Sequence, residues 1–179
     1  MKTLPDSLRP GLRLLSIGLN PSLPSVAAGF YFANPRNRFW KVLNASGLLS
    51  RPVEPGPDAM AVLLEREGMG FTDLVKRPTR GAADLRAKDY RAATPQLRAL
   101  IDRYQPYCAW FHGKLAYSYF VRYGGVEVDG DIDWGLQPQR IGTSRIFVTP
   151  NPSPANAVFS VTDLVQAYRE LAEFLPGQR

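Results

Sequence analysis

The chain has 179 residues, of which 45% are hydrophobic, and this is enough for one domain with a buried core over residues 1–179. The formal net charge is +6 with basic side chains scattered along the chain, so we expect a polyanionic partner bound by the folded surface. No apolar run approaches the ~18 residues of a membrane span, and the single cysteine, Cys108, excludes an internal disulfide and a Cys₄ metal site.

The first half of the chain predicts two strands with two helices between them. An apolar run predicts a buried strand at Arg13–Leu19, followed by a loop at 21–35 rich in Gly, Ser, Pro and aromatic residues. Asn34-Pro35 is typical of a helix start and Gly47 of its end, and a second helix is predicted from Pro57 to Gly68. A short strand at Gly70–Val75 follows.

The second half continues the alternation. A helix opens at Thr94-Pro95 and ends at Pro106, before a strand at Tyr107–Phe111. A turn at 112–114 leads into a helix through about Val121. Residues 124–142 are polar and contain several glycines, which indicates a hairpin or a long loop. A strand at Arg145–Thr149 and a final helix opened by a capping box at 160–163 complete the chain.

Strands separated by helices predict an α/β fold. We expect a three-layer α/β/α domain around a central, mainly parallel four-stranded sheet. In such a sheet the carboxyl ends of the strands lie along one edge, where α/β proteins bind ligands. Polar residues follow all four predicted strands, so the sequence predicts a functional site at that edge.

One tripeptide occurs twice in the same context. Asn20-Pro21-Ser22 and Asn151-Pro152-Ser153 each follow an apolar strand directly. Proline ends a strand, so both turns are expected to leave the sheet in the same way and to form two walls of one pocket.

The motifs around these turns resemble the mismatch-specific uracil/thymine-DNA glycosylase family. The resemblance is carried by Gly18-Leu19-Asn20-Pro21-Ser22, by the run from Gly29 to Trp40 (Gly-Phe-Tyr-Phe-Ala-Asn-Pro-Arg-Asn-Arg-Phe-Trp), and by Thr149-Pro150-Asn151-Pro152-Ser153. The segments 72–79 (Thr-Asp-Leu-Val-Lys-Arg-Pro-Thr) and 166–171 (Gln-Ala-Tyr-Arg-Glu-Leu) also resemble the bacterial branch. The likeness covers nearly the whole chain in the same order, and the fold that it implies agrees with the one predicted from the residues.

The resemblance implies roles for residues of the first turn and the loop after it. Asn20 matches the family's catalytic asparagine, whose amide oxygen accepts from a water while its NH₂ donates to the base or substrate. Phe32 matches the aromatic residue that stacks on the flipped base. The backbone N–H groups of Leu19 and Phe32 are expected to bind the pyrimidine carbonyls, with Ser25 as a pocket hydroxyl and Asn151 as a further base-binding residue.

Asp73 departs from the family pattern, since the bacterial relatives tend to have a lysine there. A carboxylate beside the pocket can activate the water or stabilise the positive sugar, which an asparagine does less well. The alternative is an exposed helix cap or an ion-pair partner of Arg77 or Lys76. The absence of that lysine also favours a monofunctional enzyme, because a Schiff base requires an amine.

The second motif departs as well. After Asn151-Pro152-Ser153 the bacterial family usually has Gly and a bulky Leu, which fills the gap left by the flipped nucleotide. Here Ser153, Pro154, Ala155 and Asn156 form the segment expected to enter DNA. Ala155 is a poor plug, so we expect weak discrimination of the opposite base, with Asn156 hydrogen-bonding the unpaired base instead.

For the other residues with reactive or charged side chains, a structural or surface role is an alternative to a functional one. His112, the single histidine, is either a general acid or, as is more common at a strand end, a structural residue. Five basic residues are candidates for phosphate contacts and otherwise belong to a solvated surface: Arg36, Arg38, Lys76, Arg77 and Lys114.

Together these features predict a monofunctional DNA glycosylase that excises uracil in base excision repair. We expect double-stranded DNA with a flipped base as the partner, or single strands, with no metal and no cofactor, in a monomer. The first residues lack the apolar stretch of a signal peptide, so we expect a cytoplasmic protein associated with the nucleoid. The alternatives are a wider substrate range (thymine, hypoxanthine, xanthine, ethenocytosine) and a catalytically weak lesion-binding module. A nucleotide-binding enzyme is disfavoured because no glycine-rich phosphate loop follows the first strand.

Overall fold

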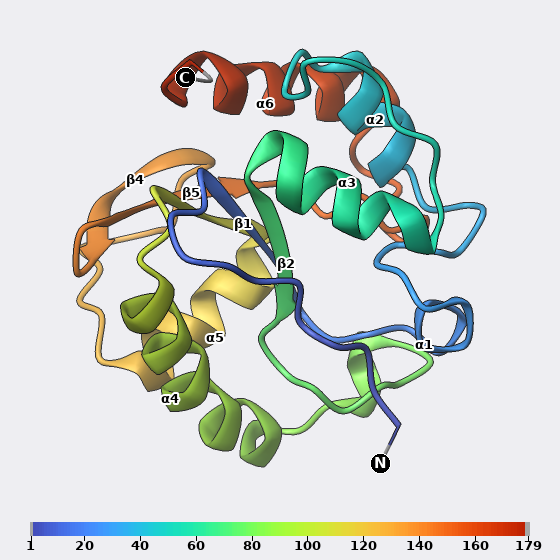
Figure 1. Ribbon diagram of the computed structural model, residues 1–179. Helices are drawn as coiled ribbons and strands as arrows, with labels where there is room; N and C mark the ends of the chain where they lie inside the picture. The colour runs from blue at the N-terminus through green and yellow to red at the C-terminus, as the bar shows by residue number, and fades with distance from the viewer. Residues whose placement is uncertain (1, 178–179) are drawn as a thin grey trace.

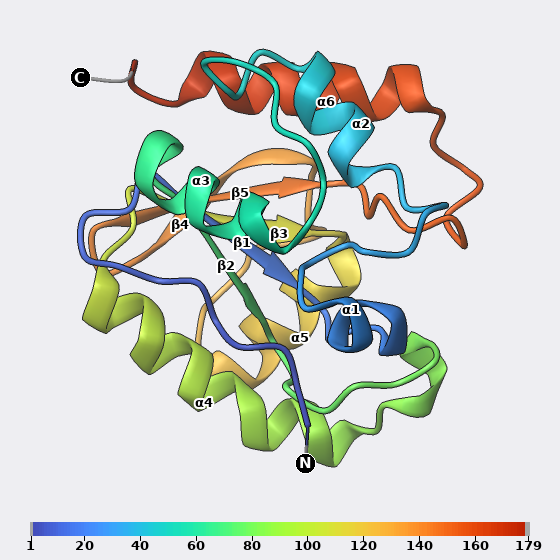
Figure 2. The same cartoon turned by 45° about the vertical axis from the view of Figure 1, so that its right-hand side comes forward.

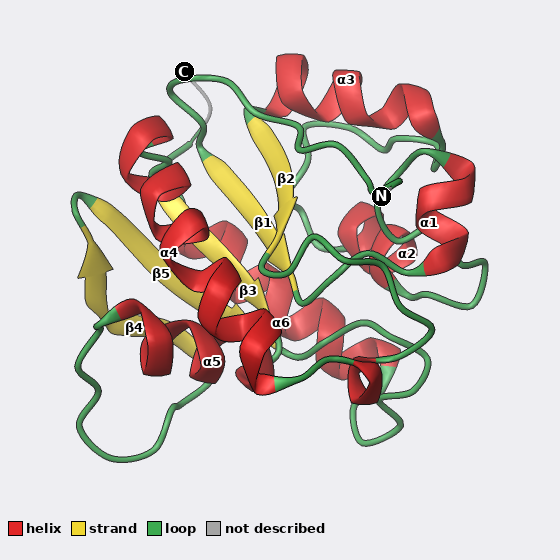
Figure 3. Ribbon diagram, turned by 90° about the horizontal axis from the view of Figure 1, so that it is seen from below, coloured by secondary structure: helices red, strands yellow, loops and turns green. Residues whose placement is uncertain are grey.

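A five-stranded sheet forms the centre of the computed structural model, which describes residues 2–177 (Figures 1 and 3). The strand order is β2-β1-β3-β5-β4; β1, β2, β3 and β5 pair in parallel, and β4 pairs antiparallel with β5. The bounds are β1 Leu14–Gly18, β2 Met69–Asp73, β3 Cys108–His112, β4 Gly135–Ile141 and β5 Ser144–Thr149.

Helices cover both faces of this sheet, so the predicted three-layer α/β/α arrangement is confirmed. Figures 1 and 2 show α2, α3 and α6 over one face and α4 and α5 over the other, with α1 beside one edge. The helices are α1 Leu23–Ala28, α2 Phe39–Ala45, α3 Pro57–Glu67, α4 Ala87–Tyr104, α5 Lys114–Gly124 and α6 Val161–Phe174, with a 3₁₀ turn at Ala82–Asp84. None of the described helices is both long and apolar enough to span a bilayer.

The four parallel strands form where the sequence is mainly apolar. In β1 every residue is buried, because side chains alternate between two cores: Leu14 packs with α2, α3 and α6, whereas Leu15 and Ile17 pack with α4 and α5. Trp110 and Phe111 of β3 divide in the same way. A strand buried on both faces is typical of parallel sheets, which is why apolar runs predicted these strands correctly.

The number of strands is corrected from four to five. The fifth, β4, lies in the polar stretch 124–142, for which the sequence predicted a hairpin or a loop. It is an edge strand in which only Gln137 and Ile141 are buried. Pro138 lies inside it, a residue that an edge tolerates because one side needs no ladder hydrogen bond. Because β4 is polar in composition, an apolar-run pattern does not predict it as a strand.

Three helix predictions also change. The predicted loop contains α1, capped by the Ser22 hydroxyl. The helix expected at Asn34-Pro35 begins only at Phe39, since the side chains of Asn34 and Asn37 bond backbone N–H groups two residues on and form turns instead. The helix expected at Thr94-Pro95 begins at Ala87, and Pro95 lies inside it.

The parallel strands end level with one another, and this places the candidate site. Gly18 at the end of β1 pairs in register with Asp73 at the end of β2, and His112 at the end of β3 pairs with Thr149 of β5. The segments that follow these four strands therefore meet at one edge of the sheet.

Candidate active site

A cavity of about 500 Å³ opens at the carboxyl edge of the sheet. Both Asn-Pro-Ser turns contribute to its wall, together with the last residues of β2 and β3 and part of the segment after β2. It is lined by nearly all of the residues that the sequence analysis assigned to a site: Leu19, Asn20, Ser25, Phe32, Asp73, Asn151, Ser153, Pro154 and Ala155. Asn156 instead lines a smaller neighbouring cavity.

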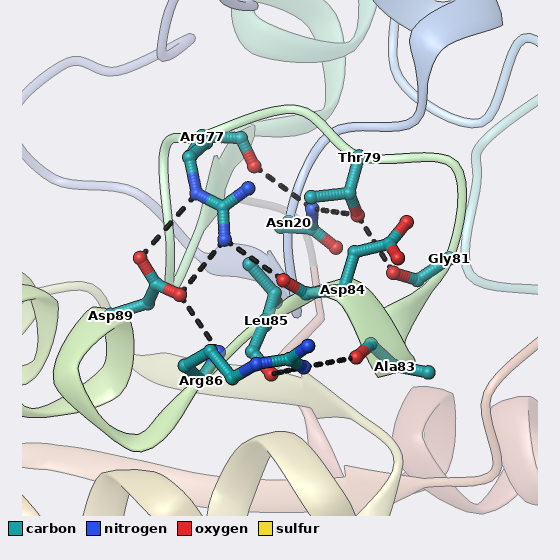
Figure 4. Close-up of polar contacts among 9 residues, drawn as sticks. All are labelled: Asn20, Arg77, Thr79, Gly81, Ala83, Asp84, Leu85, Arg86 and Asp89. Atoms are coloured by element: carbon teal, nitrogen blue, oxygen red, sulfur yellow. Dashed lines mark hydrogen bonds and ion pairs between the residues drawn. The ribbon is translucent and has the colours of Figure 1, made fainter.

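The amide of Asn20 has a fixed orientation. Its Nδ2 donates to the carbonyl oxygen of Arg77 at 2.9 Å and to Oγ1 of Thr79 at 2.8 Å (Figure 4). The Thr79 hydroxyl in turn donates to the carbonyl of Gly81 at 2.9 Å, so it accepts from Asn20. Both N–H groups of the amide are thus engaged, and Oδ1 is the part left to accept from a molecule in the cavity. The expected donation from NH₂ to a base does not fit this arrangement.

The segment after β2 is built to hold that amide. Its backbone N–H groups at Leu74, Val75 and Thr79 donate to the carbonyls of Gly18, Leu19 and Pro21 respectively. Farther along, the Arg77 guanidinium forms an ion pair with Asp89 of α4 at 2.9 Å and donates to the Asp84 carbonyl (Figure 4). The first turn is therefore tied to α4 through a segment fixed at both ends.

Asp73 lies deep at the cavity wall, with only 4% of its surface exposed. Burial raises the pKa of its carboxyl to about 7; the positive charge of Lys76 opposes this shift and the negative charge of Asp6 adds to it. The alternative roles do not hold: Lys76 pairs with Asp6 at 2.6 Å, Arg77 pairs with Asp89, and the carboxyl is not exposed. A carboxyl with a pKa near neutrality is suited to exchange protons at physiological pH.

Gly18 is what allows the carboxyl to sit there. A Cβ atom at this position would lie 2.5 Å from Oδ1 of Asp73, a distance that no real side chain tolerates without movement. The Asp73 carboxyl therefore packs directly over the backbone that leads into Leu19 and Asn20.

Phe32 reaches the cavity through an unusual backbone conformation. Its φ is +58°, in the left-handed region that costs a non-glycine residue on the order of 1 kcal/mol. The ring stacks on Phe39 with centroids 4.1 Å apart, and the Ser25 hydroxyl accepts from the next backbone N–H, that of Ala33, at 3.1 Å. Ser22 also donates to the Ser25 hydroxyl, so Ser25 braces this loop as well as lining the cavity.

The ring of His112 contacts that of Phe32 in an edge-on arrangement, with centroids 5.2 Å apart. Its Nε2 is 2.8 Å from Oγ of Ser16, whereas Nδ1 is buried and without a hydrogen-bond partner among the described residues. Burial lowers the pKa of the imidazole to about 3, so the ring is neutral at pH 7. A neutral ring cannot act as a protonated general acid, which favours the structural role.

The second Asn-Pro-Ser turn is held by an arginine from another part of the chain. Arg38 donates to four carbonyls of the 152–159 loop, those of Pro152, Ser153, Asn156 and Phe159. Within the loop, Oδ1 of Asn151 accepts from the Ser153 N–H at 2.9 Å, and Nδ2 of Asn156 donates to the Asn151 carbonyl at 3.0 Å. Arg38 is thus an internal brace, which corrects its assignment as a phosphate contact, and the Asn156 NH₂ is already engaged.

A comparison with protein families places this site in a known context. The model of the uracil DNA glycosylase superfamily matches residues 5–172, nearly the whole chain. The chain belongs to this superfamily. Its fold is similar to the solution NMR structure of a Methanosarcina acetivorans protein described as a candidate uracil DNA glycosylase, with 18% sequence identity, a TM-score of 0.60, and coverage of 95% of this chain and 97% of that one.

Membership of the uracil DNA glycosylase superfamily supports hydrolysis of N-glycosyl bonds in DNA as the general activity, with DNA as the partner. The sequence analysis did not predict the roles of two polar residues that position groups of the site. Thr79 orients the Asn20 amide and Arg38 shapes the second turn. Both lie inside the motifs that carry the resemblance, which is the signal that pointed toward them; their hydrogen-bond partners are distant in sequence and leave no local pattern.

Proposed function

We propose that this protein is a monofunctional glycosylase that takes uracil out of the DNA helix and hydrolyses its N-glycosidic bond, with G:U mismatches among its substrates. The observation that carries the proposal is the meeting, in one cavity, of an outward amide oxygen on Asn20, a buried carboxyl on Asp73 and the half-buried ring of Phe32. These groups supply an acceptor for water, a base and a stacking surface.

In the proposed reaction the bond between the base and C1′ of the sugar breaks, and its electron pair leaves with the base. A water whose proton is accepted by the Asp73 carboxylate forms the new bond to C1′, and Asn20 Oδ1 holds that water in place. The carboxylate also stabilises the positive charge that develops on the sugar. The backbone N–H groups of Leu19 and Phe32, with the Ser25 hydroxyl, are proposed to bind the uracil.

Phe32 is proposed to stack on the extruded base. An aromatic platform contributes about 1–3 kcal/mol per base and does not depend on which base is bound. Its support by Phe39 and by the Ser25 brace holds the ring in place before substrate arrives, so less conformational freedom is lost on binding.

The 153–156 loop is proposed to enter the DNA where the base has left. Pro154 and Ala155 are exposed at its tip, and neither fills the space of a base. We propose a member of the mismatch-specific branch whose opposite-base preference is relaxed by this small loop tip, so that it is also active on other pairs or single strands. The second candidate function is a wider substrate range that includes hypoxanthine, xanthine and ethenocytosine, since a cavity of about 500 Å³ has room for a base larger than uracil.

The test is a panel of single-turnover cleavage reactions in the presence of EDTA. Uracil, thymine, hypoxanthine, xanthine and ethenocytosine are placed opposite each base and in single strands. We expect abasic product from uracil substrates without added metal or cofactor, and uracil faster than the others. Binding without product on every substrate would overturn the proposal in favour of a lesion-binding module.

A further inference from the structure

A second cavity, of about 240 Å³, adjoins the candidate active site. The two cavities share Leu19, Ala82, His112 and Asn151 in their walls. The remainder of the smaller cavity is formed by different side chains, among them Lys114, Leu115, Trp134, Asn156 and Phe159. None of the mechanistic roles proposed above involves Lys114, Leu115, Trp134 or Phe159.

Its surface is aromatic and apolar, and yet solvent reaches it. Trp134, just before β4, is 40% exposed, and Leu115 in the first turn of α5 is 49% exposed. Phe159 contacts the indole edge-on, with centroids 5.3 Å apart. Large apolar side chains gathered at a cavity in this way mark a binding surface, because their exposure to water is unfavourable.

Positive charge lies at the same place. The Lys114 ammonium sits 4.5 Å from the centroid of the Trp134 ring, a cation–π contact. Lys114 is also the first residue of α5, and the preceding residue, Gly113, has no side chain to cap the N-terminus of this helix. An aromatic face next to an ammonium and a helix N-terminus matches the two parts of a nucleotide, its base and its phosphate.

We propose that this second cavity binds the nucleotide adjoining the extracted one on the same DNA strand, with its base on Trp134 and its phosphate at Lys114. The assignment rests on the proposed function. It follows from the shared walls, because the occupants of the two cavities would be immediate neighbours. Consecutive nucleotides of one strand are neighbours of this kind, since the sugar–phosphate backbone links them. When the phosphate draws the ammonium of Lys114 away, the face of the indole that it covers becomes available to the base.

The subsite has a consequence for the weak plug at Ala155. Extraction of a base costs stacking energy, and a bulky wedge is one way to regain it. Here the neighbouring base also leaves its stack, and its stacking on Trp134 at the protein surface offsets part of the total cost. The enzyme then depends on the strand that carries the lesion more than on the opposite one.

The test is a cycle that combines a protein variant with DNA lacking one base. Trp134→Ala is compared with the wild type on uracil DNA in which an abasic analogue replaces the 5′ neighbour, the 3′ neighbour or the opposite base. We expect about a tenfold loss of affinity for intact DNA, and no loss for DNA that lacks one flanking base. Trp134→Phe should retain most of the affinity. Tyr107→Ala should retain all of it, because Tyr107 is equally exposed but precedes β3, at the end of the parallel strands opposite the candidate active site.

A loss of the same size on all DNAs, or one that disappears only when the opposite base is missing, would overturn the proposal. Lys114→Gln gives an independent measurement should Trp134→Ala be unstable: the slope of log affinity against log salt should fall by about one. An unchanged slope would count against the subsite. Excision of uracil by the wild type decides the proposed function separately, since the cycle compares affinities only.

Discussion

At the first Asn-Pro-Ser turn both N–H groups of the asparagine amide bond to another segment, whereas at the second turn the amide oxygen is engaged by the turn's own backbone. Asn20 Nδ2 donates to Arg77 and Thr79, and Asn151 Oδ1 accepts from Ser153. The same tripeptide therefore offers an acceptor to the cavity at one wall and the NH₂ donor at the other. Partners distant in the sequence, rather than the tripeptide itself, decide which end of the amide remains for a ligand.

The largest expected effect comes from removing the acceptor. Asn20→Ala should slow single-turnover excision of uracil by about 10²–10³-fold, because the attacking water loses its position while base binding is retained. Asn151→Ala, the matched change at the second turn, should cost about tenfold or less. Equal losses in the two variants would show that the two amides are interchangeable and would remove the contrast.

Asp73→Asn separates catalysis from stability. Its rate should fall about 10²-fold, and the wild-type rate should rise with pH through about 7 as the carboxylate forms, a rise that the variant lacks. Because the pKa of the folded state lies above the usual value, this group favours folding at low pH and loses that contribution as pH rises from about 4 through 7.

The same variant should therefore be more stable than the wild type at pH 8, by on the order of a few kcal/mol, with the difference vanishing near pH 4. Chemical denaturation at the two pH values measures this. A variant that is both slower and less stable at pH 8 would indicate that the carboxyl is structural.

Thr79→Val tests the orientation of the first amide. The valine keeps the shape of the side chain but removes the acceptor at 2.8 Å from Asn20 Nδ2, so excision should slow about 10-fold with unchanged DNA affinity. Thr79→Ser should restore the rate. If the valine variant binds DNA more weakly in proportion to its rate, Thr79 acts on the shape of the cavity instead.

Arg38→Ala addresses the second turn. Loss of its hydrogen bonds to the loop should lower the free energy of unfolding by about 2 kcal/mol and weaken DNA affinity. The matched control is Arg36→Ala, an exposed residue that lines the large cavity, which should leave stability unchanged. A loss of stability confined to Arg36→Ala would reverse our interpretation.

The smallest effect is expected at the tip of that loop. Ala155→Leu should sharpen the preference for guanine opposite uracil by several-fold, because the larger side chain replaces part of the lost stacking. Rates on substrates with each opposite base measure it. An unaltered preference would mean that this position does not enter the helix.

The sequence predicted the parallel strands and their shared edge, because strands buried on both faces are mainly apolar. It concealed β4, a half-exposed edge strand, and it misplaced the start of α4, where Pro95 lies in the helix interior instead of its first turn. The motifs and the order of the strands also predicted that Asn20, Phe32 and Asp73 lie at one cavity, as they do. The direction of the Asn20 amide and the raised pKa of Asp73 depend on packing between segments far apart in sequence, which no local pattern records.

Because Arg38 holds the second loop through its backbone, the course of this loop depends little on the side chains at its exposed positions. The guanidinium holds backbone carbonyls only, so nothing at positions 154, 155, 157 and 158 is needed to keep the loop in its course. These four positions are all exposed. They can be randomised together in a library while the fold is left intact, and such a library offers a direct route to glycosylases with altered choice of DNA context.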